Sequence, residues 1–171
     1  MNHTYFFALN AFAPLQDISH SGLDLAYAYF DPFEPSNDLI YLQEVKTTGG
    51  IDLSYADNLI SDYRKLFGED GSVTYNTRIQ GISMQIELQH QRPDLADRLR
   101  NLSETQVSRC NQVRLIPTLV HERVGTAPVE KLVGVKSAIT ALGWSAQQVA
   151  PWSIAMTDLI DRLVRLSRGH R

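Results

Sequence analysis

The chain has 171 residues, of which 43% are hydrophobic, and this length supports one α/β domain spanning residues 1–171. A formal net charge of -3 at pH 7 argues against nucleic-acid binding through bulk positive charge, so phosphate contacts would come from a local patch or a bound metal. The single cysteine, Cys110, excludes an internal disulfide and a cysteine-rich zinc site, and the lack of a long apolar run or a leader-like start predicts a cytoplasmic protein that does not enter a membrane.

Strands are expected in the first third of the chain. Residues 5–12 fit a strand and a helix nearly equally well. Residues 22–30 and 38–47 are apolar and rich in aromatic and β-branched types. The loop between them, DPFEPSN, contains two prolines and two further turn formers, Asp31 and Asn37. These two segments are therefore predicted to form a β-hairpin.

The rest of the chain is expected to alternate helices and strands. Ser54 and Asp57 resemble a capping box, and apolar residues then recur at helical spacing up to Gly68. Further helices are predicted around residues 79–86, 93–102, 126–142 and 157–166, and strands over 113–122 and 149–156. Pro117 in the first of these strands indicates a sheet edge or a bulge. The order predicts a three-layer α/β fold, with a mixed central sheet flanked by helices on both faces.

The tripeptide Glu44-Val45-Lys46 interrupts an otherwise apolar strand. Because side chains alternate along a strand, Glu44 and Lys46 share one face with Ile40 and Leu42, and Val45 lies on the other. The plain alternative is a solvated charge pair, which contributes little to stability. Burial of the face by its apolar neighbours favours a functional site instead.

The predicted hairpin supplies a partner for Glu44. If Phe30 pairs with Asp38 across the loop, paired residue numbers add to 68, as Asp24 and Glu44 also do. Paired side chains have Cβ atoms about 4.5–5.5 Å apart, close enough for two carboxylates to hold one divalent cation. A bulge would turn Asp24 to the opposite face. Asp38 shares the face of Glu44 but lies roughly 20 Å along the strand, at the hairpin end.

The run SGLDLAYAY, a turn, and then YLQEVKTTGG resemble the signature of the PD-(D/E)xK nuclease superfamily. In that family an acid on one strand precedes an acid-x-Lys tripeptide on the next. The resemblance covers about residues 20–67, including the helix expected after the motif strand. An acid-x-Lys tripeptide alone is common, but the preceding acid at the right distance, the buried strand and the trailing Thr-Thr-Gly-Gly loop make the whole pattern more specific.

The resemblance implies a restriction-endonuclease-like core that hydrolyses phosphodiester bonds, in DNA rather than RNA. It implies Asp24 and Glu44 as ligands of Mg²⁺ (or Mn²⁺), with the backbone carbonyl of Val45 as a further oxygen ligand. Lys46 would hold the attacking water and help to deprotonate it, and its charge would stabilise the reacting phosphate. Asp24, Glu44 and Lys46 are thus the implied catalytic residues. The setting implied is a restriction or anti-phage defence system with a helicase or ATPase partner subunit.

The chain departs from that family at its start. Members usually have a helix before the first core strand, often bearing another acid, whereas 23 residues precede Asp24 here and their one acid is Asp17. Asp17 or His20 could take that role, or a partner subunit could complete the site. The alternative function is a non-catalytic subunit of the same fold, acting as an assembly or DNA-binding module. A second alternative is a small interaction or immunity protein with a solvated charged trio.

Three further features of the sequence say less about function. Gly49 and Gly50 either let the backbone approach a phosphate or form a strand-to-helix turn. Trp144 and Trp152 are predicted to pack in the core. Arginines at every third position of the last helix and its tail either complement the helix dipole or contact phosphate. These arginines are Arg162, Arg165, Arg168 and Arg171.

Overall fold

The computed structural model describes residues 5–9, 24–49, 53–67, 71–103, 111–122 and 125–168. The strands are β1 (Tyr5–Leu9), β2 (Leu25–Phe30), β3 (Leu39–Thr48), β4 (Val113–Glu122) and β5 (Trp152–Met156). The helices are α1 (Tyr55–Phe67), α2 (Gly71–His90), α3 (Pro93–Ser103), α4 (Ala127–Thr140) and α5 (Leu159–Ser167), and a short 3-10 turn spans Pro35–Asn37. Asp17, His20, Gly50, Cys110 and Arg171 lie outside the described residues.

The strands form one mixed sheet in the order β1-β2-β3-β4-β5. The first three are antiparallel neighbours, whereas β4 runs parallel to β3 and β5 runs parallel to β4. Leu25 pairs with Gln43 and Tyr29 with Leu39, so paired numbers add to 68 and the predicted hairpin register is confirmed. The predicted α/β class and mixed sheet are confirmed as well. Residues 5–9, which the sequence left undecided between strand and helix, are a strand.

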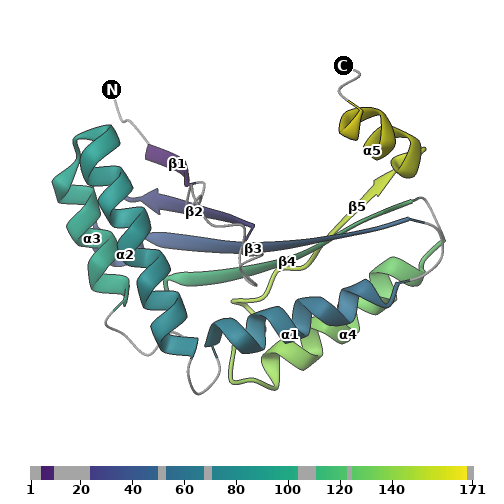
Figure 1. Ribbon diagram of the computed structural model, residues 1–171. Coiled ribbons are helices and arrows are strands. Elements are labelled where there is room, and N and C mark those ends of the chain that lie inside the picture. The colour runs from purple at the N-terminus through teal and green to yellow at the C-terminus, as the bar shows by residue number, and fades with distance from the viewer. Residues whose placement is uncertain are drawn as a thin grey trace.

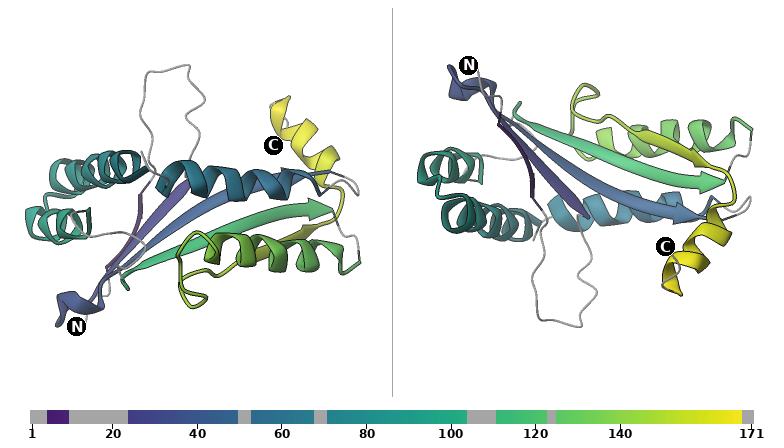
Figure 2. Two further views of the ribbon diagram at one scale, coloured as in Figure 1. Left: turned by 90° about the horizontal axis from the view of Figure 1, so that it is seen from below. Right: turned by 90° about the horizontal axis from the view of Figure 1, so that it is seen from above.

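Helices α1 and α4 lie side by side along one face of the sheet (Figure 1). Seen from above, the strands lie in front of both helices (Figure 2). On the covered face, Ile40 and Leu42 of β3 are fully buried and belong to the same core as Leu59 of α1 and Ile139 of α4. Both α1 and α4 lie on this one face of the sheet. The predicted layer of helices on the opposite face therefore stays a prediction.

The apolar periodicities predicted the core well within the central elements and less well at the edge. Ile79 and Ile86 of α2 are buried as predicted, and so is Trp144. The prediction for Trp152 is wrong, because its relative exposure is 52%. Trp152 belongs to β5, the edge strand, which has a neighbour on one side only among the described strands. Val129 on α4 is an exposed apolar side chain too.

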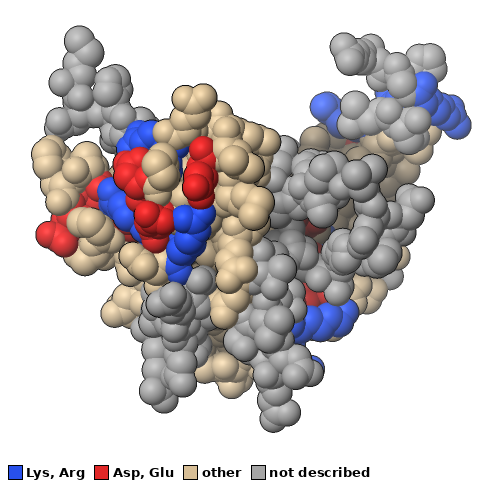
Figure 3. All heavy atoms as spheres, turned by 60° about the vertical axis from the view of Figure 1, so that its left-hand side comes forward, with Lys and Arg blue, Asp and Glu red and all other residues tan. Residues whose placement is uncertain are grey.

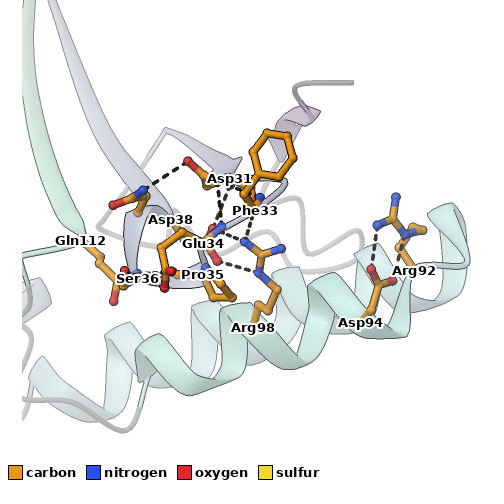
Figure 4. Close-up of polar contacts among 11 residues, drawn as sticks. Asp31, Phe33, Glu34, Pro35, Ser36, Asp38, Arg92, Asp94, Arg98 and Gln112 are labelled. Carbon is orange, nitrogen blue, oxygen red and sulfur yellow. Dashed lines mark hydrogen bonds and ion pairs between the residues drawn. The ribbon is translucent and has the colours of Figure 1, made fainter. Parts of the chain in front are cut away.

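The loop between β2 and β3 is anchored to α3 by Arg98 (Figure 4). Its Nε donates to Asp38 Oδ2 at 2.8 Å, and its Nη2 donates to Asp38 Oδ1 and, at 2.7 Å, to the carbonyl oxygen of Asp31. The Asp38 side chain is only 3% exposed and also accepts a hydrogen bond from Asp31 N at 2.9 Å. The guanidinium lies 5.5 Å from the ring centroid of Phe30. Asp38 is thus at the hairpin end, as predicted, where it joins the loop to a helix.

Charges of both signs are interleaved over the α2 and α3 side of the molecule (Figure 3). Arg100 pairs with Glu87 and with Asp97, and Arg92 pairs with Asp94. Because these pairs neutralise one another, this side offers a phosphate little net attraction.

Helix α5 rests against the end of β3 at Gly49. A Cβ placed on Gly49 would lie 2.6 Å from both Cγ1 and Cδ1 of Ile160. The close atoms belong to the outer end of the Ile160 side chain, which is half-exposed, so the glycine lets α5 lie near β3 but is not strictly required there.

We expect Gly49→Ala to lower the free energy of unfolding by less than about 1 kcal/mol, because the added methyl group meets the outer end of the Ile160 side chain, which is half-exposed and can turn aside. Urea denaturation would measure the loss. In the double variant Gly49→Ala/Ile160→Ala the added methyl group should be tolerated better, so the two effects should not add. An additive result would contradict this account of the glycine.

Candidate active site

Strand β3 extends beyond the end of its pairing with β2. The hairpin ladder closes at Leu25 opposite Gln43, and Asp24 lies just outside it, with its N–H donating to Gln43 O at 3.1 Å. The Asp24 carboxylate turns back onto β3, where Oδ2 accepts a hydrogen bond from Val45 N at 2.7 Å. In an extended strand the N–H and C=O of one residue point to the same side. The carbonyl of Val45 therefore points to the side of β3 where β2 has ended, next to Asp24. We call this open place beside β3 the notch.

Glu44 lies on the face of β3 that the helices cover, and its side chain is 5% exposed. Its Oε1 accepts from Lys46 Nζ at 2.6 Å, whereas the buried Oε2 has no hydrogen-bond partner among the described residues. Burial raises the pKa of Glu44; the bond to Lys46 works against this, and the charge of Asp24 raises the pKa further. A buried carboxylate oxygen without a partner is unfavourable, so this position favours a cation or a proton.

Lys46 bridges two carboxylates. Its Nζ lies 2.6 Å from Glu44 Oε1 and 2.6 Å from Oδ2 of Asp62, which projects from α1. Burial acts to lower the pKa of Lys46, but the bonds to Asp62 and Glu44 outweigh it, and the pKa lies above its ordinary value. Lys46 is therefore an ammonium at neutral pH.

Tyr63, the residue after Asp62, binds the backbone of β3 at Glu44. Its hydroxyl donates to Leu42 O at 3.0 Å and accepts from Glu44 N at 3.3 Å. Burial holds the pKa of Tyr63 well above its usual range, which keeps the hydroxyl protonated.

Pro117 of β4 lies opposite Glu44 in the register. The backbone groups of Leu115, two residues earlier, bind Gln148 and Ala150 on the β5 side of β4, so the N–H that Pro117 lacks falls on that side and not on the side of β3. Strand β4 lies between β3 and β5, so the edge alternative predicted from Pro117 is wrong. Its pairing on the β5 side is nevertheless interrupted at Pro117, between the Leu115–Val149 bridge and the ladder that begins at Thr118.

Three of the residues predicted from the sequence meet at this place. Glu44 and Lys46 are in direct contact, and Asp24 is bound to the intervening Val45 and close enough for its charge to act on Glu44. Across the part of the chain that the structure describes, no three acidic, histidine or cysteine side chains converge to hold a metal by themselves.

Sequence reasoning missed Asp62 and Tyr63. A signal for Asp62 was available, because it stands three residues after Leu59 on the buried side of α1, where an isolated charge needs a partner.

The donors at the notch fit a hard divalent cation. The carboxylate of Asp24, the unpartnered Oε2 of Glu44 and the carbonyl of Val45 are all oxygens, the ligands that Mg²⁺ prefers, and waters commonly complete its coordination. The orphaned oxygen of Glu44 is the observation that makes the fit specific, because a bound cation would supply its missing partner.

Comparison with known proteins assigns no family to the chain. No protein-family model matches the sequence, and no curated protein matches it. None of the described helices is both long and apolar enough to pass through a bilayer.

Proposed function

We propose that the protein is a metal-dependent nuclease of the PD-(D/E)xK type, with a three-layer restriction-endonuclease-like core, that hydrolyses DNA. The observation that carries the proposal is the Glu44 carboxylate, which is buried, bound to Lys46 through one oxygen and unpartnered at the other among the described residues. A solvated charge pair on an interaction protein would be exposed to water at both oxygens. Burial of this kind is typical of functional sites.

Each residue of the site has a distinct task in this proposal. Asp24, Glu44 and the Val45 carbonyl would hold Mg²⁺ or Mn²⁺, which when bound lowers the pKa of a water ligand and neutralises phosphate charge. Lys46, held as an ammonium by its two carboxylates, stabilises negative charge on the reacting phosphate and orients the water; it does not accept the proton. Tyr63 keeps Glu44 in register by binding its backbone.

The charge of the molecule supports a partner in DNA binding. The net charge is -3 and Arg98 and Arg100 of α3 are paired with acids, so sequence-independent attraction to DNA is weak. The resemblance noted above points to a helicase or ATPase subunit that delivers the DNA, within a cytoplasmic restriction or anti-phage defence system.

A second candidate function has one observation in its favour. Lys46 forms an ion pair with both Glu44 and Asp62, which neutralises part of the acidic charge without a metal, as expected for a site that no longer turns over. In this case the protein would be a non-catalytic subunit of the nuclease fold, acting as an assembly or DNA-binding module.

Cleavage by the purified protein, alone and with its partner, tests the proposal. We expect degradation of DNA in Mg²⁺ or Mn²⁺ and none in EDTA, with RNA as the comparison substrate. Glu44→Gln keeps the shape of the side chain but removes its charge, and should lower the rate by about 100-fold or more. The matched control is Glu130→Gln on α4, whose carboxylate binds Thr126 at the surface and should not affect cleavage. Full cleavage by Glu44→Gln would overturn the proposal, and DNA binding without cleavage would support the second candidate.

A further inference from the structure

We propose that Asp62 is a positioning residue that keeps the Lys46 ammonium in the site when Glu44 turns its carboxylate to a bound cation. The catalytic consequence of this role rests on the proposed function, but the holding of Lys46 by Asp62 does not. Asp62 does not belong to the acid-x-Lys motif. It contacts Lys46 of that motif from helix α1.

The Lys46 ammonium contacts the carboxylates of Glu44 and Asp62 at the same distance. Lys46 Nζ is 2.6 Å from an oxygen of Glu44 and 2.6 Å from an oxygen of Asp62, so neither carboxylate has the shorter bond. The Asp62 side chain is 11% exposed, and its other oxygen lies 3.6 Å from Nζ of Lys65, which is mostly in solvent. Asp62 therefore directs its stronger interaction inward, to Lys46.

Lys46 would otherwise compete with a metal for the same carboxylate. Among the described residues its carboxylate partners are Glu44 and Asp62, and Glu44 is also a candidate metal ligand. If Glu44 were the sole partner, a cation that bound Glu44 would release the long, flexible lysine side chain. With Asp62 present, Glu44 can bind the cation while Lys46 keeps an anchor. An anchored charge is pre-organised for the reacting phosphate.

Asp62 is not placed to be a metal ligand itself. The ammonium of Lys46 stands between the carboxylates of Glu44 and Asp62, and the described acids do not converge in a group of three. The helix that carries Asp62 is fixed to the strand at the next residue, because Tyr63 binds the backbone of Leu42 and Glu44. The distance from Asp62 to Lys46 is thereby set by the fold.

Nuclear magnetic resonance of the lysine ammonium groups tests the holding directly. The chain has four lysines, Lys46, Lys65, Lys131 and Lys136, so the ¹⁵Nζ signals can be assigned with single Lys→Met variants. We expect a protected Lys46 signal in the wild-type protein both without Mg²⁺, where the ion pairs with Glu44 and Asp62 slow exchange of its protons with water, and with Mg²⁺, where the pair with Asp62 remains. In Asp62→Asn, addition of Mg²⁺ should weaken this signal several-fold, while the Lys131 signal should not change.

Kinetics then test the catalytic consequence. Asp62→Asn should lower kcat about tenfold with KM for DNA changed less than twofold, because the interaction acts on the reacting phosphate and not on DNA binding. Asp62→Glu retains the charge and should recover part of the loss, whereas Lys65→Met should match the wild type. A Lys46 signal in Mg²⁺ that is equally protected in wild type and Asp62→Asn would overturn the proposal. If the signal weakens as expected but the wild-type protein does not cleave, Asp62 still holds Lys46 and the nuclease function alone is wrong.

Discussion

Lys46→Met is expected to abolish most DNA cleavage, by about 100-fold or more, without loss of metal binding. Methionine keeps much of the apolar stem but removes the ammonium that stabilises phosphate charge. Glu44 and Asp62 then face each other without the cation between them, so attraction for a divalent ion should rise. Titration with Mn²⁺ followed by electron paramagnetic resonance would measure the affinity, which we expect to equal or exceed that of the wild-type protein.

The same variant should show a stability that depends on metal. In EDTA its melting temperature should be lower than that of the wild type, because Glu44 is left buried beside Asp62 without a counter-charge. Saturating Mg²⁺ should recover much of the difference, since a ligand that binds only the folded state stabilises it. Lys131→Met is the matched control, because Lys131 forms a surface ion pair with Asp57 at 2.8 Å. Retained cleavage in Lys46→Met would remove Lys46 from the active site.

Arg98→Met is expected to give the largest loss of stability in the protein, about 3–5 kcal/mol. The substitution leaves the buried Asp38 carboxylate without its cation, and breaking a buried ion pair from one side is strongly destabilising. It also frees the carbonyl of Asp31, so the hairpin loop loses its attachment to α3. Urea denaturation monitored by circular dichroism would give the free energy of unfolding, and Arg98→Lys serves as a milder variant.

Two comparisons separate the charge from the packing at this position. Arg92→Met removes an arginine from the same region, where Arg92 pairs with Asp94 in solvent (Figure 4), and should cost less than about 1 kcal/mol. The double variant Arg98→Met/Asp38→Leu should be more stable than Arg98→Met alone, because it leaves no unpaired buried charge. A loss below 1 kcal/mol for Arg98→Met would mean that the loop is held by other contacts.

Local patterns in the sequence were sufficient for most of the fold. Alternation and turn residues predicted the β2–β3 hairpin, and the constant sum of paired numbers predicted its register. Alternation also placed Glu44 and Lys46 together, because that inference needs only one strand. The exposure of Trp152 could not be predicted in this way, since periodicity does not reveal which strand lies at the sheet edge.

The missing part of the site depends on how a helix docks onto a strand. Asp62 belongs to α1, and its contact with Lys46 follows from the position of that helix on the sheet, which local periodicity does not specify. Tyr63 is among the apolar residues at helical spacing before Gly68, but the contacts of its hydroxyl with Leu42 O and Glu44 N likewise follow from the position of α1 on β3. Tertiary contacts of this kind decide which of several buried polar groups take part in a site.

The placement of the site along the chain bears on when the site is assembled during synthesis. The side chains of the site come from residues 24–63, namely Asp24 just before β2 and residues of β3 and α1, so these parts can meet early during synthesis. The strand that completes the sheet beside Glu44 begins only at residue 113, after two more helices. Joining strands so far apart in sequence is slow. We therefore expect Glu44 to stay hydrated in a nascent chain until β4 has been made and docked; under the proposed function, the unfinished chain would not cleave DNA.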